Sequence, residues 1–122
     1  MLNHAQENRP PVTLEVARGF WSRFRGWMGR RPLPGTALLI YPCSSVHTFF
    51  MLEPIDIVFV DRQGQVLSVM ERLGPWRVSP WVREAAAVIE MPAGSAASLG
   101  FRAGKFLPAP WAEIIRTIMD GS

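Results

Sequence analysis

The sequence has a single cysteine, Cys43, among its 122 residues. An internal disulfide is therefore impossible, and folding does not depend on an oxidising compartment. The polar first eleven residues lack the apolar segment of a signal peptide, so we expect a cytoplasmic protein. The longest apolar runs, such as Ile55–Val60 with Asp56 inside it, are far shorter than the ~18 residues needed to cross a bilayer. We expect no membrane span.

Several motifs that identify an enzyme class are also absent from the sequence. The sequence contains no glycine-rich phosphate-binding loop, no HExxH zinc motif and no CxxC pair. The segment Gly94–Ser98 does not match the GxSxG turn that carries a nucleophilic serine. Catalysis, if there is any, would have to come from side chains without a recognisable local motif.

The composition is that of a folded domain. Apolar residues make up 48% of the chain and aromatic residues 11%, which argues against disorder. We expect residues 1–11 to be a loose N-terminal leader and residues 12–122 to form a single globular domain. The net charge is +3, and Lys105 is the only lysine, so almost all positive charge is arginine. This surplus permits an anionic partner without requiring one, and nucleic acid is disfavoured.

Short β-prone runs between turns dominate the chain. Six runs are typical of strands, namely residues 12–17, 36–41, 46–51, 55–60, 65–70 and 85–91. Asp61–Gly64 predicts a hairpin turn, residues 95–99 predict one helical turn, and Gly100 with Gly104 predicts a further short hairpin. The fold class is therefore mainly β (α+β): a small barrel or sandwich of six or more short strands.

Two segments have helical spacing instead. The first is an early amphipathic helix between Gly19 and Gly29, with its apolar face made by Phe20, Trp21, Phe24, Trp27 and Met28. The second is a C-terminal helix after Pro110, with its apolar face made by Trp111, Ile114, Ile115, Ile118 and Met119. Both are expected to pack on the sheet.

Four ordered motifs resemble a known family. They are Arg23–Met28, Thr48–Met51 followed by Ile55–Asp61, Val88–Gly94, and Gly100–Lys105. Together they are similar to the bacterial and archaeal domain-of-unknown-function family 192, over roughly Val12 to Leu107. Trp27 and Lys105 depart from the family pattern, which has Leu and Asp there. The resemblance implies a small mainly-β fold with one early helix, and it implies no activity.

Two acidic residues, Asp56 and Glu90, indicate a candidate site. The two-residue period of a strand places Asp56 on the face of Val58 and Val60, and Glu90 on the face of Val88. Each acid thus shares a face with apolar residues. A buried carboxylate needs a partner or becomes protonated. The available partners are Arg23, Cys43, His47 and Thr48, and we expect a polar cluster around His47.

This cluster has three interpretations. In a structural network, Arg23 would join the early helix to the sheet through Asp56 or Glu90. In a pocket, the cluster would bind a small molecule, an anion or a metal ion, whose candidate ligands are Cys43, His47, Asp56 and Glu90. In a small metal-assisted or Cys/His hydrolase-like enzyme, His47 would act as base for Cys43 or a water, oriented by Asp56. No motif in the sequence indicates which cofactor, if any, the protein binds.

Arginines and tryptophans offer a further surface. An Arg-rich stretch runs from Arg18 through the early helix, and an anion or nucleic-acid binder would use its arginines Arg23, Arg25, Arg30 and Arg31. Trp76, Arg77 and Trp81 form a separate candidate recognition surface. A polar cluster without a catalytic motif favours a non-catalytic binding or accessory module, with a small ligand or a protein as partner.

Overall fold

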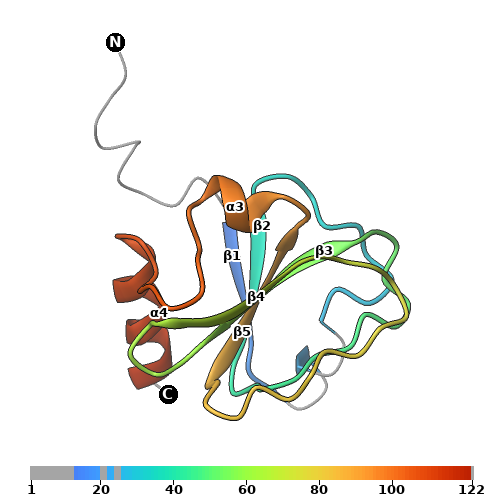
Figure 1. The fold of residues 1–122 in the computed structure, drawn as a ribbon. Helices are drawn as coiled ribbons and strands as arrows, with labels where there is room; N and C mark the ends of the chain where they lie inside the picture. The colour runs from blue at the N-terminus through green and yellow to red at the C-terminus, as the bar shows by residue number, and fades with distance from the viewer. Residues whose placement is uncertain (1–12, 20–21, 24–25, 122) are drawn as a thin grey trace.

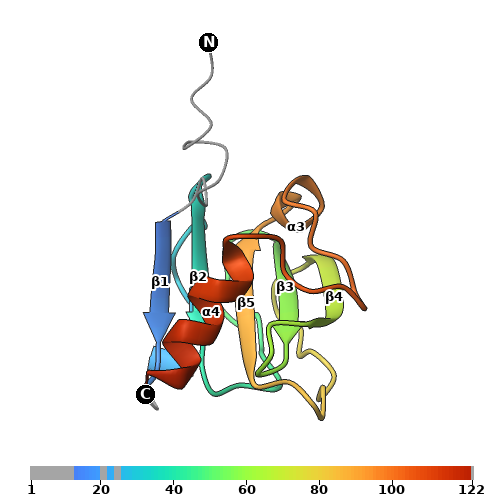
Figure 2. The same ribbon diagram turned by 90° about the vertical axis from the view of Figure 1, so that its left-hand side faces the viewer.

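The computed structural model, drawn in Figure 1, describes residues 13–19, 22–23 and 26–121. The described strands form one mixed five-stranded sheet in the order β1-β2-β5-β3-β4, as Figure 2 shows. The strands are β1 (Thr13–Ala17), β2 (Thr36–Ile40), β3 (Ile55–Val60), β4 (Val66–Leu73) and β5 (Ala87–Pro92). β1 runs parallel to β2, and the other neighbouring pairs are antiparallel. Two helices follow, α3 (Ser95–Ser98) and α4 (Trp111–Asp120).

The three central strands of the sheet, β2, β5 and β3, are buried on both faces. All six residues of β3 are buried, which explains why this strand is a nearly continuous apolar run in the sequence. One core lies between the sheet and α4, which crosses one face of the sheet in Figure 2. A second core lies on the opposite face and includes Trp27 and Phe59. The site described below lies on this second face, away from α4.

The predicted apolar face of the C-terminal helix is confirmed in part. Trp111, Ile115 and Met119 repeat every four residues and are buried against the sheet. The Trp111 ring packs edge-on against Phe101, with 5.2 Å between ring centroids. Among the described residues, no helix has the length and the hydropathy that crossing a bilayer requires.

The prediction of a barrel or sandwich with six or more strands is wrong for the described part of the chain. Its sheet is open, with β1 and β4 as edges. Residues 46–51 do not form a strand, because Phe50 has a positive φ of 62° and only His47 forms an isolated bridge, to Val78. Around the predicted Gly100–Gly104 hairpin there is likewise only a single bridge, between Gln65 and Phe106.

The early helix is not confirmed over its predicted length. Phe20, Trp21, Phe24 and Arg25 lie outside the described residues. Ser22 and Arg23 have helical backbone, but Gly26 has a φ of 49°. Helical backbone therefore stops before Gly26, earlier than the predicted end at Gly29, because the left-handed conformation interrupts it.

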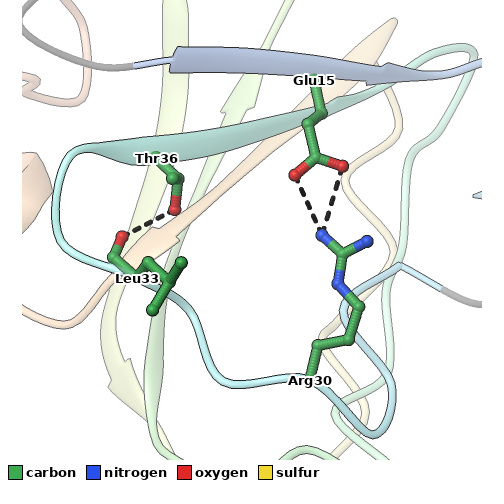
Figure 3. A network of polar contacts seen from close by, with 4 residues as sticks. All are labelled: Glu15, Arg30, Leu33 and Thr36. Carbon is green, nitrogen blue, oxygen red and sulfur yellow. Dashed lines mark hydrogen bonds and ion pairs between the residues drawn. The ribbon is translucent and has the colours of Figure 1, made fainter.

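The segment between β1 and β2 is attached to both strands (Figure 3). Nη2 of Arg30 lies 3.1 and 2.9 Å from the two carboxylate oxygens of Glu15 on β1. The Thr36 hydroxyl at the start of β2 donates to the Leu33 carbonyl at 2.6 Å. The ion pair is exposed to solvent and contributes little stability, so its effect is mainly to orient the segment.

Candidate functional site

The two predicted acids are both buried, but they lie on opposite faces of the sheet. Asp56 has an exposed fraction of 0% and Glu90 of 2%. Asp56 pairs with Met91 across β3 and β5, and Glu90 pairs with Ile57. Directly paired residues point to the same face. Asp56 therefore faces α4 and Glu90 faces the loops on the other side, so the acids do not form one cluster.

Asp56 is fully engaged by backbone groups. Its Oδ1 accepts a hydrogen bond from the Arg72 amide at 3.0 Å. Its Oδ2 accepts from the amides of Gly94 and Ala96, each at 3.0 Å. The side chain thus connects β3 to the end of β4 and to the start of α3. This is the arrangement of a structural acceptor rather than a ligand or a catalytic residue.

Thr48 is also structural, and it joins two loops. Its buried hydroxyl donates to the Gly74 carbonyl at 2.6 Å and accepts from the Arg77 amide at 2.8 Å. Its backbone N–H donates to the Arg77 carbonyl, and its carbonyl accepts from the Trp76 amide. These bonds hold the loop after Val46 against the segment that follows β4.

The two joined loops present aromatic side chains to solvent. Phe49, Phe50 and Trp76 are exposed, and the Trp76 ring centroid lies 5.8 Å from that of Phe49 and 4.6 Å from that of Phe50. Phe50 and Trp76 both have positive φ, at 62° and 64°. Such backbone is rare for large residues and persists only where the surroundings fix it. Trp76 was predicted to lie on a recognition surface, and it is exposed.

A separate cavity of about 910 Å³ opens between the loop after β2 and the segment before β5. Four of the predicted site residues line it, namely Arg23, Cys43, His47 and Glu90. Asp56 and Thr48 do not. The sequence thus identified part of the cavity's polar lining. At the cavity's apolar mouth it predicted Trp81, as part of a separate recognition surface, and it did not predict Val78. Exposed Val78 and Trp81 stand there, with exposed fractions of 62% and 76%.

His47 is half-buried at the cavity wall, on the side toward the aromatic loops. Its Nδ1 accepts a hydrogen bond from the Phe49 amide at 3.1 Å. The two rings are 5.1 Å apart, centroid to centroid. Since Nδ1 accepts, the neutral ring carries its proton on Nε2. The imidazole is therefore oriented by the chain's own backbone.

Glu90 is the most unusual group of the cavity. The Trp27 amide donates to its carboxyl group, yet Oε1 has no hydrogen-bond partner within the described part of the chain. Burial raises the pKa of Glu90 to about 8 and outweighs the opposing effect of the Trp27 bond. At neutral pH the group is mostly protonated, so it is both a hydrogen-bond donor and an acceptor.

Gly26 keeps the space beside this carboxyl group open. It lines the same cavity, and a Cβ at this position would lie 3.1 Å from Oε1 of Glu90. Its φ of 49° is also strained for other residues. Both the backbone conformation and the close approach therefore require glycine here.

Arg23 does not join the sheet through a carboxylate, as one interpretation of the sequence predicted. Its Nη1 donates to the Pro42 carbonyl at 3.0 Å. Within the described residues it forms no ion pair with Glu90 or Asp56, and its Nε is buried without a partner. Arg23 and Glu90, which both line the cavity, thus each have one buried polar atom without a partner among the described residues.

Cys43 is a protonated thiol. Its Sγ lies 3.1 Å from the Ser45 carbonyl and donates to it. Burial raises the pKa of Cys43 above its usual value and nearby Glu90 adds to the rise, whereas the Ser45 contact and Arg23 oppose it. The thiolate needed for nucleophilic attack is therefore scarce at neutral pH. No three His, Cys, Asp or Glu side chains in the described ranges lie close enough together to hold a metal ion.

The other arginines of the predicted basic surface are engaged within the chain. Arg18 donates to the Ile118 carbonyl, and Arg30 and Arg31 pair with Glu15 and Glu53. Arg25 lies outside the described residues. The guanidinium groups of Arg18, Arg30 and Arg31 each have a partner within the chain, so they do not form a surface of unpaired cations.

Comparison with known proteins agrees with the motifs. The DUF192 family model, described as an uncharacterized ACR, matches residues 2–108. The chain belongs to the DUF192 family. A UPF0127 protein of Pyrococcus abyssi is 35% identical over 100 residues, which are 77% of this chain and 83% of the relative. A UPF0127 protein of Pyrococcus furiosus is 30% identical over 109 residues, which are 85% and 92% of the two chains.

Solved structures share the fold of this DUF192 protein. A protein of unknown function from Novosphingobium aromaticivorans matches with a TM-score of 0.70 at 24% identity, over 78% of this chain and 73% of that one. A protein from Sinorhizobium meliloti, which carries a provisional name as a transcription regulator, matches with a TM-score of 0.70 at 26% identity, over 80% and 81%. The open mixed sheet is therefore not peculiar to this chain.

Proposed function

We propose that this DUF192 protein is a non-catalytic binding module that takes a small organic ligand in the cavity beside Glu90. The observation that carries the proposal is the Glu90 carboxyl group, which is almost fully buried in the cavity wall with one oxygen unpaired. Buried polar atoms in native proteins nearly always have a partner, and an unpaired one costs about 1–3 kcal/mol. A ligand would supply that partner.

The surroundings of the cavity support binding. A volume of about 910 Å³ is within the range of small-molecule sites, which combine apolar walls with a few placed polar groups. Here the polar groups include Arg23, His47 and Glu90, and the apolar groups at the mouth are Val78 and Trp81. The structural groups Asp56 and Thr48 fix the strands and loops around them.

Catalysis by the same residues is less well supported. A Cys/His hydrolase needs a thiolate, but burial raises the pKa of Cys43. The orienting acid of that mechanism was to be Asp56, and this side chain lies on the other face of the sheet with three backbone partners. The cavity therefore has a donor and an acceptor for a ligand but lacks the geometry of a triad.

The proposal is tested with four probes that share one apolar body and differ in the head group: 3-phenylpropionate, 3-phenylpropanamide, 3-phenylpropanol and 3-phenylpropylamine. Amide resonances of the ¹⁵N-labelled chain are followed during titration. We expect saturable shifts from at least one probe at the amides of residues 43–47, 78–86 (apart from Pro80) and 90. If none of the four probes causes a saturable shift at these residues, the proposal is wrong.

A cavity-filling variant provides the control. Ala85 lines the cavity, and Ala103 is exposed and does not. Ala85→Phe should abolish the shifts, because the ring occupies the space of the probe, whereas Ala103→Phe should leave them unchanged. Equal shifts in both variants would place the binding elsewhere and refute the proposal.

A further inference from the structure

The cavity holds two buried polar atoms that the fold leaves unused. They are Nε of Arg23 and Oε1 of Glu90, and both residues line the cavity. Arg23 donates to the Pro42 carbonyl, next to Cys43, and Oε1 of Glu90 lies beside Gly26, so both residues border the same part of the cavity as that thiol. One ligand head group placed beside Cys43 would be close to both.

The chemistry of these atoms selects the head group. A guanidinium N–H can only donate, and a carboxyl group that holds its proton donates through its O–H. Two converging donors require an acceptor with several lone pairs, and a carboxylate fits because its oxygens accept up to four hydrogen bonds. An ammonium group cannot accept at all, so it would leave Arg23 unpaired and face a like charge.

The mouth of the cavity selects the rest of the ligand. Val78 and Trp81 have exposed fractions of 62% and 76% although they line the cavity. An aromatic or aliphatic body that extends from the head group would cover both side chains. Burial of such apolar surface contributes about 25 cal/mol per Å² before the costs of association.

We propose that this cavity recognises an organic acid, with its carboxylate between Arg23 and Glu90 and its apolar body against Val78 and Trp81. This inference rests on the proposed function and gives it a ligand class. Gly26 contributes by leaving room beside Oε1 of Glu90, where any side chain would intrude.

The four phenylpropyl probes test the head group directly on the unmodified chain. Dissociation constants are measured at pH 6.5 from the amide shifts of residues 43–47. We expect 3-phenylpropionate to bind roughly tenfold or more tightly than the alcohol, and the amine to bind most weakly. Acetate, which lacks the apolar body, should bind weakly. Equal affinities for acid, amide and alcohol would overturn the organic-acid inference while leaving a small-molecule cavity intact.

Variants separate the two polar contacts. Arg23→Gln should remove most of the preference for the acid, whereas Arg102→Gln, at an exposed arginine outside the cavity, should not. Trp81→Ala should weaken the acid and the alcohol by a similar factor, because it removes contact with the body they share. If Arg23→Gln leaves the ratio of acid to alcohol affinity unchanged, the carboxylate does not bind there and the inference fails.

The pH dependence provides an independent readout. Affinity for 3-phenylpropionate should fall between pH 6.5 and pH 9.5, since a deprotonated Glu90 would repel the carboxylate. Glu90→Gln keeps an N–H donor and should flatten this dependence. Besides Arg23 and Glu90, the titratable or charged groups lining the cavity are Tyr41, Cys43, His47, Arg62 and Glu84. Cys43→Ser controls for the thiol. An unchanged pH profile in Glu90→Gln would contradict the role of Glu90.

Discussion

Replacing Asp56 with asparagine should destabilise the protein severely, although the two side chains have nearly the same shape. The carboxylate accepts three backbone N–H groups, one at Oδ1 and two at Oδ2, and it is fully buried. An asparagine can present only one oxygen. Its best orientation keeps the Gly94 and Ala96 bonds and turns the NH₂ group toward the Arg72 N–H, so that two donors face each other.

The magnitude follows from these three bonds. The unpaired Arg72 N–H costs about 1–3 kcal/mol, and the other two bonds each weaken by roughly 1 kcal/mol because the acceptor loses its charge. The expected loss is about 3–5 kcal/mol. Since small domains have unfolding free energies of about 5–15 kcal/mol, this is a large fraction of the total.

Asp61 offers a matched control. Its Oδ1 alone accepts both the Gln63 and Gln65 amides, each at 2.9 Å. Asp61→Asn can keep both bonds through its single oxygen, and because Asp61 is only half-buried, the lost charge weakens them less than at Asp56, so we expect a loss of about 1–2 kcal/mol. Urea denaturation followed by circular dichroism gives both values. If Asp56→Asn costs no more than Asp61→Asn, the three-bond account of Asp56 is wrong.

Three further outcomes are expected. Burial raises the pKa of Glu90 from 4.5 to about 8, so the folded chain keeps a proton that the unfolded chain releases in that interval. The free energy of unfolding, measured with urea, should therefore fall by up to a few kcal/mol as pH rises from about 5 to 8.5, and it should fall less in Glu90→Gln. If the unfolding free energies of the two proteins change with pH in parallel, this role of Glu90 is wrong. Thr48→Val removes the bonds to Gly74 and Arg77 and should cost about 1–3 kcal/mol with faster exchange of the Arg77 amide, whereas exposed Thr117→Val should be nearly neutral. Similar losses in the two variants would contradict the role of Thr48. Because burial raises the pKa of Cys43, iodoacetamide should alkylate it several-fold more slowly than N-acetylcysteine at pH 7.5, as mass spectrometry would measure, and an equal rate would count against a protonated thiol.

Most strands could be predicted because their patterns are local. The runs at residues 36–41 and 55–60 are almost wholly apolar and end at turn residues, and they form β2 and β3. The run at 46–51 has the same character but is not a strand. Its conformation is decided by Thr48, whose partners lie beyond β4 and whose bonds no local pattern reveals.

The site was predicted less completely, for a reason of geometry. Alternation showed correctly that Asp56 and Glu90 face apolar surroundings. It could not show that they face opposite sides, because a strand buried on both faces carries no polar mark of orientation. Only the register, with Asp56 opposite Met91 and Ile57 opposite Glu90, decides this. The cavity itself lies between loops that are far apart in the sequence and that the fold brings together, so no local pattern of residues predicts it.

The position of β5 also constrains how the protein can be made. β2 and β3 do not pair with each other, and each instead pairs with β5, which begins only at Ala87. A nascent chain on the ribosome that has not yet released this segment has two unconnected strand pairs with exposed apolar edges. Such edges invite pairing with other chains. We therefore expect arrested chains that end before Ala87 to aggregate, and the full sheet to form only after β5 has left the ribosome.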